Sequence, residues 1–326
     1  MLLSVGYVGS IGRSLVRSYE GNPITIAGQA ACAADPSCVA DRVNQHPDFP
    51  DHSLVDGLAF ASVGQQVTDG SSNYNSLQVS VKKGFTHGLN FTAAYTYSHA
   101  LDNGSGLENT GFGSRGTNPY PQFAYLNYGD SGYDARQRFV IGYTYSIPDL
   151  HKFTRFAPSM LFKGWMLSGI TTLQTGFPVT LADTGFRSLF CDSWSYYACP
   201  DQPNFVATSV KTLDPRTASF TVGGVSRGTY WFNPADFVRA PIGTLGNAPR
   251  NFFHGPGINN TDFVIEKDTY WPGSEGKYVA LRLEAYNVFN HTQFLAPSGN
   301  IASVNFGRIT SAAPGRQVQL GAKIYF

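Results

Sequence analysis

Hydrophobic and polar residues alternate along eight segments of the chain in the period-two pattern of amphipathic β-strands. In the clearest segment, residues 89–98, Leu89, Phe91 and Tyr95 fall on one face and Asn90 falls on the other. Each segment is close to the length with which a tilted strand crosses a bilayer, about 9–11 residues. The eight predicted strands are residues 2–9, 74–83, 89–98, 138–147, 165–175, 262–269, 278–289 and 317–326.

The connections between these segments alternate between short and long, as they do in an antiparallel transmembrane barrel with short periplasmic turns and long extracellular loops. Counting backwards from a periplasmic C-terminus places every short connection in the periplasm. This count treats residues 57–67 as a strand inside an external loop. We also expect residues 178–181 and 218–222 to form strand extensions within the long loop 176–261. The shorter connections are 84–88, 151–163 and 270–276, and the long ones are 11–73, 99–137, 176–261 and 290–316.

Charged side chains fall on only one face of the seventh predicted strand, residues 278–289. In residues 278–289, Leu281 and Leu283 share the face opposite Arg282 and Glu284. A wet lumen accepts charge and lipid does not, so Arg282 and Glu284 are predicted as lumen-facing polar residues. They either contact a solute or form a structural charge ladder along the inner wall. The fold class that we predict is all-β: an antiparallel transmembrane β-barrel segment with about eight spanning strands and long extracellular loops.

Composition agrees with a barrel and excludes some classes of function. Charged residues make up 14% of the chain, below the ~25% of ordinary soluble domains. The net charge of +1 predicts no nucleic-acid partner. No apolar run approaches the ~20 residues of a membrane-spanning helix. Aromatic residues close to predicted strand ends suggest interfacial girdles, and these are Tyr145, Trp165, Tyr270, Trp271, Tyr278, Tyr325 and Phe326.

The four cysteines form two local pairs in loop-like sequence, Cys32 with Cys38 and Cys191 with Cys199. In an oxidising compartment each pair can close a short disulfide loop, and free thiols are the alternative. A zinc site is a third interpretation, although the separations are wider than the usual C-x₂₋₄-C spacing. The seven histidines show no metal-site spacing, so we predict neither a metal nor a cofactor.

The chain shows no catalytic constellation, and we predict that it is not an enzyme. Residues 111–116 match G-x-G-x-x-G, but they follow no predicted strand and open no helix, so the match is attributed to chance. Asn287 and Asn290 are predicted to cap a strand end, although contact with a ligand is the alternative. Asp134, Arg136 and Arg138 are predicted to form a salt-bridge cluster near the external rim.

The last ten residues alternate down to a C-terminal aromatic residue. Their end resembles the signal that the barrel-insertion machinery reads, which carries a polar residue, a glycine, an apolar residue and a final aromatic residue at fixed spacing. Four residues occupy these positions: Gln319, Gly321, Ile324 and Phe326. The alternative is an ordinary amphipathic strand at the end of a soluble β-domain.

Several stretches together resemble the C-terminal part of TonB-dependent outer-membrane receptors, in particular the large Oar-like type with a carboxypeptidase-regulatory-like N-terminal domain. The most specific is R-L-E-A-Y-N-V-F-N-H at residues 282–291, followed by the closing strand. The shorter pieces are weak individually, but together they extend over nearly the whole chain. They are residues 5–10, 74–78, 94–99, 134–139, 164–165, 231–234, 246–251 and 254–257.

The resemblance implies a barrel of about 22 strands with a plugged lumen, energised through TonB. Residues 1–326 correspond to the C-terminal part of that barrel, and we expect the plug, the TonB box and a signal peptide to lie on missing upstream sequence. The implied function is uptake of a scarce solute, such as an oligosaccharide, a peptide or a metal chelate, with residues 99–137 and 176–261 as recognition loops. The implied partners are the outer-membrane bilayer, the insertion machinery and TonB.

Two other functions fit parts of the pattern. The chain is compatible with a closed eight-stranded barrel that serves a structural or adhesive role without transport, because eight strands can close around a side-chain-filled interior. It is also compatible with a soluble β-rich binding module, which would need no detergent. The many Asn, Thr, Ser, Gly and Gln residues on the inward faces favour a wide wet lumen over the small closed barrel.

Overall fold

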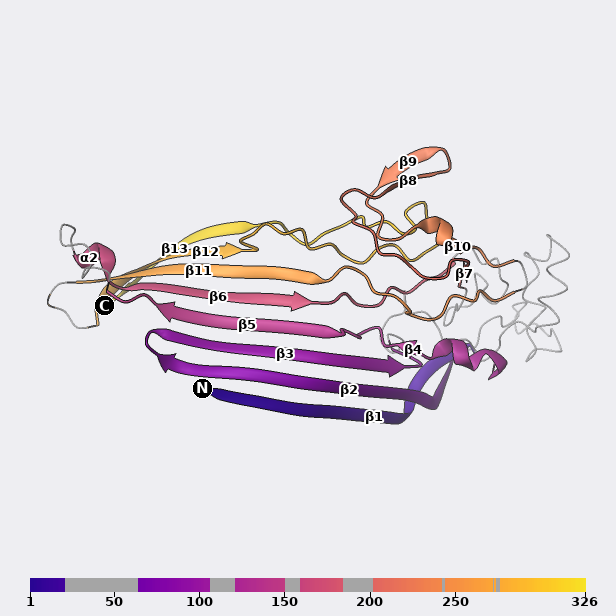
Figure 1. Ribbon diagram of the computed structural model, residues 1–326, viewed down its shortest axis with the longest axis horizontal. Helices are drawn as coiled ribbons and strands as arrows, with labels where there is room; N and C mark the ends of the chain where they lie inside the picture. The colour runs from indigo at the N-terminus through magenta and orange to yellow at the C-terminus, as the bar shows by residue number, and fades with distance from the viewer. Residues whose placement is uncertain are drawn as a thin grey trace, which may run out of the picture.

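The fold is dominated by one large antiparallel sheet, seen in a computed structural model (Figure 1). The structure describes residues 1–20, 64–105, 121–149, 159–183, 202–241, 244–271, 273 and 276–326. Nine strands make up the sheet in the order β1-β2-β3-β5-β6-β11-β12-β13, with β4 paired to β3. These strands are β1 (Leu2–Glu20), β2 (Gly64–Thr86), β3 (Leu89–Asp102), β4 (Gly129–Asp130), β5 (Gln137–Ser146), β6 (Trp165–Gln174), β11 (Ile258–Tyr270), β12 (Tyr278–Tyr286) and β13 (Gln317–Tyr325).

Both chain termini and the short connections lie at one end of this sheet, which we call the turn end (Figure 1). The opposite end, the loop end, carries the small strands and short helices. These are η3 (Pro121–Asn127), β7 (Asn204–Phe205), β8 (Ser219–Val222), β9 (Val225–Gly228), η5 (Pro234–Asp236) and β10 (Phe237–Val238). The helix α2 (Ser159–Phe162) lies at the turn end, and no helix among the described residues is long and apolar enough to span a bilayer.

The strand register gives the sheet one apolar face and one polar face. Across β12 and β13, Leu283 stands opposite Leu320, whereas Glu284 stands opposite Gln319. The same parity passes through every neighbouring pair to β1, where Val5 stands opposite Val79. Because side chains alternate strictly in a strand, this continuity means that the predicted amphipathic strands form one sheet with an apolar face and a polar face. We call this two-sided sheet the wall.

The tight turn between β2 and β3 shows how the sequence fixes the register. His87 and Gly88 both have positive φ, 53° and 79°, and Thr86 pairs with Leu89 across the turn. Two consecutive residues with positive φ form the hairpin turn whose twist matches that of the flanking strands. A β-carbon at Gly88 would lie 2.5 Å from the Ser146 carbonyl oxygen, so glycine is required there for space as well.

All eight predicted strands are present, but several predicted boundaries were wrong. The first two were predicted as 2–9 and 74–83, whereas β1 continues to Glu20 and β2 begins at Gly64. Residues 64–67 are therefore the start of β2 and do not belong to a separate strand in an external loop. The seventh was predicted to reach residue 289, but β12 ends at Tyr286 because Asn287 has a φ of 50°.

Two further sequence predictions need correction. Residues 178–181 were expected to form a strand extension, but they make only an isolated bridge from Pro178 to His254. The girdle prediction was wrong for three tyrosines. Tyr270, Tyr278 and Tyr325 are cross-strand neighbours of one another on the polar face, and the Tyr278 and Tyr325 rings stack with centroids 4.3 Å apart. Tyr145 and Trp165 do lie on the apolar face.

The loop end holds a small folded unit with its own core, which we call the loop layer. It consists of residues 176–183, 202–241, 244–257 and 294–312, and Phe232 at its centre is fully buried. The Phe232 ring packs edge-to-face against Phe237, Phe253 and Phe306 at 5.2–5.4 Å between centroids. Edge-to-face packing of this kind stabilises beyond the area that it buries. The long loops at this end thus contain an ordered core, in addition to their polar residues.

The sheet is open in the described part of the chain. β1 pairs only with β2 and β13 pairs only with β12, so the two outermost strands stand at opposite edges. Each edge therefore presents a row of backbone groups without a ladder partner, which is a template for pairing with another strand. This arrangement differs from the closed eight-stranded barrel that the sequence also allowed.

Candidate functional site

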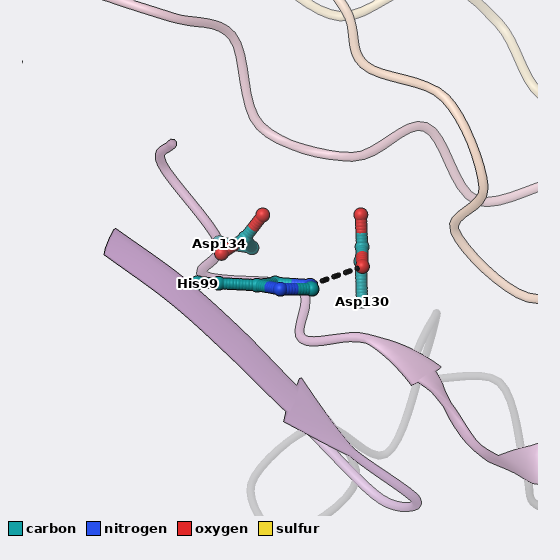
Figure 2. Close-up of side chains that lie close together, drawn as sticks. All are labelled: His99, Asp130 and Asp134. Atoms are coloured by element: carbon teal, nitrogen blue, oxygen red, sulfur yellow. Dashed lines mark hydrogen bonds and ion pairs between the residues drawn. The ribbon is translucent and has the colours of Figure 1, made fainter. Parts of the chain in front are cut away.

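A cluster of ionisable side chains lies at the loop end, where β3, β4 and the segment before β5 meet. His99 belongs to β3, Asp130 to β4, and Asp134 to the turn that follows (Figure 2). His99 Nε2 lies 3.0 Å from Asp130 Oδ1, and the ligand-type atoms of all three residues lie within 4.8 Å of one another. The Asp134 side chain is completely buried and that of Asp130 is 14% exposed. Buried carboxylates need hydrogen bonds and countercharge, which the neighbours supply.

Arg136 joins the two carboxylates of this cluster. Its Nη2 donates to both oxygens of Asp130 at 2.9 and 3.0 Å, and its Nε donates to Asp134 Oδ2 at 2.5 Å. Burial by itself would raise the pKa of Asp130, but the hydrogen bonds from His99 and Arg136 lower that pKa below its ordinary value. The carboxylate is therefore held in its charged form. The predicted salt-bridge cluster is present for Asp134 and Arg136.

A distant segment of the loop layer completes the cluster. His254 Nε2 lies 3.3 Å from Asp134 Oδ2 and 3.8 Å from Asp130 Oδ2. Asn251 Nδ2 donates to the Asp130 carbonyl oxygen at 2.8 Å. His99 and His254 are far apart in the sequence, so their spacing gave no signal of a shared site. Sequence reasoning predicted Asp134 and Arg136 but missed the two histidines, because only the tertiary fold brings their segments together.

Arg250 forms a second contact between the same loop and the wall. Its Nη1 donates to the Asp102 carboxylate and to the Asp102 carbonyl oxygen, both at 2.8 Å, and its Nη2 donates to Ser105 Oγ at 2.8 Å. The close approach depends on Gly129, where a β-carbon would lie 2.5 Å from the Arg250 carbonyl oxygen. Asp102 Oδ1 accepts backbone N–H bonds from Gly104 and Ser105, an arrangement typical of an aspartate that begins a turn.

The polar face of the sheet contains a hollow of about 540 Å³, a size typical of small-molecule sites. Five neighbouring strands line it: β3, β5, β6, β11 and β12. The lining residues with polar side chains on this face are Asn90, Thr92, Thr144, Ser168, Asp262, Arg282, Glu284 and Tyr286.

Two charged groups of this hollow, Arg282 and Glu284, are paired with each other, whereas Asp262 accepts hydrogen bonds from Asn260 Nδ2 and the Asn287 N–H, both at 2.9 Å. Arg282 Nη2 lies 2.9 Å from Glu284 Oε1, and Arg282 Nε lies 3.1 Å from Glu266 Oε2. Glu284 also accepts hydrogen bonds from Tyr286 Oη, at 3.1 Å, and from Gln319. The structure thus places Arg282 and Glu284 side by side on the polar face, in a charge ladder that extends over β11 and β12 and is joined by Gln319 of β13. Contact with a solute at these two residues stays a prediction.

The remaining predicted residues lie in several parts of the chain. Gln319, Gly321 and Ile324 belong to the edge strand β13, and the following Phe326 is 98% exposed. Recognition of these four residues by the insertion machinery stays a prediction. Asn287 caps a turn, since its Oδ1 accepts from His291 N–H and its Nδ2 donates to the His291 carbonyl oxygen, both at 2.9 Å. The predicted cysteine pairs, Cys32, Cys38, Cys191 and Cys199, and the G-x-G-x-x-G match at 111–116 lie outside the described residues.

Comparison with known families agrees with the two-sided wall. The model of the family described as an outer membrane beta barrel domain matches residues 1–319. The chain belongs to this outer-membrane β-barrel family. Its location is therefore the outer membrane, in association with the bilayer, and the soluble binding module that the sequence also allowed is excluded.

Two other comparisons provide less information about the protein. A search of curated proteins found no match. Among solved structures, the chain resembles the outer membrane transporter YddB from Escherichia coli, with 9% sequence identity and a TM-score of 0.46. The similarity covers 99% of this chain and 30% of that one, so the chain spans less than a third of the length of that transporter.

Proposed function

We propose that this chain forms part of the wall of a TonB-dependent transporter of the Oar-like type, which takes up a scarce polar solute and catalyses no reaction. The observation that carries the proposal is the hollow on the polar face, which five adjacent strands line while their other face is apolar. A transport barrel needs this arrangement, with lipid on one side of the wall and a wet passage on the other.

The two open edges support a barrel larger than the described sheet. Neither β1 nor β13 has a second neighbour among the described strands, and unpaired edges are costly within a membrane. Further strands on both edges would satisfy these groups and widen the lumen. The sequence resemblance to receptors with about 22 strands agrees with this larger barrel, and it implies that a plug and a TonB box lie on other sequence.

The chemistry of the hollow favours an uncharged, hydrogen-bonding solute. Arg282 is already held between Glu266 and Glu284, so it offers no free positive charge to an anionic solute. The hollow offers hydroxyl and amide groups instead, from residues such as Asn90, Thr92 and Thr144. Of the three solute classes that the resemblance implies, a neutral oligosaccharide matches these groups better than a charged peptide or a metal chelate.

Filling the hollow tests the proposal directly. Gly142 lines the hollow, and a β-carbon there would meet only Ile170 Cγ1 at 3.9 Å, so Gly142→Leu adds bulk without displacing the backbone. Gly6 is a matched control, because it lies on the polar face of β1 outside the hollow and has nothing within 4 Å of its β-position. Cells that produce the protein are given radiolabelled maltotetraose, a charged tetrapeptide and ferric citrate, with and without TonB.

Uptake of maltotetraose that requires TonB, falls at least tenfold in Gly142→Leu and persists in Gly6→Leu would support the proposal. Uptake that is equal with and without TonB would contradict the energised mechanism. The absence of uptake for all three probes, with normal amounts of protein in the outer membrane, would favour the non-transporting structural or adhesive barrel. Immunodetection in isolated outer membranes supplies the measure of those amounts.

A further inference from the structure

The loop-end cluster has fewer positive than negative groups around its buried carboxylates. Asp130 and Asp134 are both largely or wholly buried, and Arg136 is the guanidinium that bridges them. The imidazoles of His99 and His254 face the same two carboxylates, so the cluster gathers nitrogen and oxygen groups of the kinds that hold divalent metal ions.

Four potential metal ligands converge at this point. His99 Nε2 and His254 Nε2 approach the carboxylates of Asp130 and Asp134 from two separate parts of the chain. The three measured separations between these nitrogens and carboxylate oxygens are 3.0, 3.3 and 3.8 Å. A tetrahedral Zn²⁺ ion with bonds of about 2.0–2.2 Å requires ligand atoms about 3.3–3.6 Å apart. These three separations lie within about 0.3 Å of that range, and the ligand-type atoms of His99, Asp130 and Asp134 lie within 4.8 Å of one another, so the side chains must also draw closer together to enclose an ion.

From this geometry we propose that His99, Asp130, Asp134 and His254 form a binding site for a divalent transition-metal ion, with Zn²⁺ as the best fit. Imidazole and carboxylate ligands suit zinc, and the cluster offers two of each. The site is independent of the polar hollow and goes beyond the proposed transport function.

The groups behind the ligands are arranged as in metal sites, where the ligating carboxylates are themselves hydrogen-bonded. The Ala100 N–H donates to Asp134 Oδ1 at 2.7 Å, while Asp134 Oδ2 accepts from Arg136 Nε at 2.5 Å and lies 3.3 Å from His254 Nε2. Arg136 holds Asp130 from the side, and a carboxylate oxygen can accept this bond with one lone pair while the other faces the metal. The carboxylates are thus oriented before an ion arrives.

The metal would join two parts of the fold. His99 and Asp130 belong to the strands of the wall, whereas His254 belongs to the loop layer. Bonds to both would fasten the loop layer to the wall, next to the Arg250–Asp102 contact. We therefore expect the ion to stabilise the loop end and to restrict how far the loop layer can move during solute entry.

Zinc binding is measured on the protein purified from outer membranes in detergent, with its four cysteines replaced by serine so that thiolates cannot compete. The protein is loaded with Zn²⁺ alone, passed through a desalting column, and its metal content is measured by mass spectrometry. His254→Gln and Asp134→Asn remove one ligand each. His87→Asn is the matched control, since His87 lies in the exposed turn at the other end of the sheet and asparagine tolerates its positive φ.

We expect one Zn²⁺ per chain in the parent and in His87→Asn, and at least a tenfold weaker affinity in the two ligand variants. Zn²⁺ should also raise the thermal unfolding temperature of the parent and leave that of His254→Gln unchanged. Equal zinc content in the parent and both ligand variants would overturn the proposal, as would no retained zinc in the parent. Heat-modifiable migration on gels confirms folding of each variant, and the visible spectrum of bound Co²⁺ reports a four-coordinate site even where affinity is reduced.

Discussion

Arg250 Nη1 lies 2.8 Å from the carboxylate of Asp102, although 148 positions separate the two residues in the sequence. This contact ties the loop layer to the loop end of β3, and both side chains are nearly buried, at 13% and 10% exposure. It is the longest-range ion pair of the wall that we describe. Its consequences for stability can be measured.

Replacing Arg250 by methionine should destabilise the loop layer by about 3–5 kcal/mol, because it leaves the Asp102 carboxylate buried without its partner. Denaturant unfolding or limited proteolysis of the loop layer provides the measurement. Lys163→Met is the control. Its partner is Asp149, and with a side chain 58% exposed its ion pair should contribute only about 0–1 kcal/mol. Equal losses in the two variants would argue against the role assigned to Arg250.

The same contact predicts how stability depends on pH. Asp102 is residue 14 of β3 from the turn end, beyond the 9–11 residues that cross a bilayer. Burial would raise its pKa, but hydrogen bonds from Ser131 and the Ser105 N–H, together with Arg250, lower the pKa below the ordinary value of 3.8. The stabilisation is therefore complete above about pH 4 and is lost as the pH falls further. Thermal unfolding between pH 7 and pH 3 should show this loss, and Asp102→Asn should reduce it.

Phe232→Ala should remove the centre of the loop-layer core and cost about 3–5 kcal/mol, as large-to-small changes of buried aromatic residues usually do. Phe232 is fully buried and contacts three other rings. Phe289→Ala is the control, because Phe289 is 77% exposed. Protease cleavage within the loop layer, compared between the two variants, reports the difference. Similar cleavage rates would show that the aromatic cluster does not stabilise this unit.

Single cysteines on adjacent residues of β3 should distinguish the two faces of the wall. Thr92 lies on the polar face and lines the hollow, whereas the neighbouring Ala93 lies on the apolar face opposite Val81 and Ile141. In a chain whose natural cysteines are changed to serine, a water-soluble maleimide should label Thr92→Cys and leave Ala93→Cys unlabelled in intact membranes. The reverse pattern would mean that the polar face meets lipid.

Phe326→Asp should reduce assembly in the outer membrane if Gln319, Gly321, Ile324 and Phe326 form the predicted assembly signal. Phe326→Tyr keeps an aromatic ring at the terminus and should assemble normally. The fraction of heat-modifiable protein in isolated outer membranes measures assembly in both variants. Normal assembly of the aspartate variant would contradict the predicted C-terminal signal. It would not affect the description of the antiparallel sheet, which depends on the strand register.

Local alternation by itself determined the existence, type and order of the spanning strands, because side chains on a strand alternate between faces whatever the rest of the chain does. The pair Leu283 and Glu284 could be assigned to opposite faces in this way. The strand boundaries could be predicted less well from the sequence. β1 and β2 extend far beyond their amphipathic parts because their backbones remain paired with each other, and pairing needs no hydrophobic pattern.

Only the tertiary structure decided the contents of the loop end. His99 and His254, like Asp102 and Arg250, come together because the loop layer folds around Phe232 and reaches across the wall to β3 and β4. No sequence period encodes such a meeting, since it depends on how side chains from several loops pack in three dimensions. The tyrosines at the turn end differ, because Tyr278 shares the parity of Arg282 and alternation already assigns it to the polar face, whereas a position near a strand end does not reveal the face.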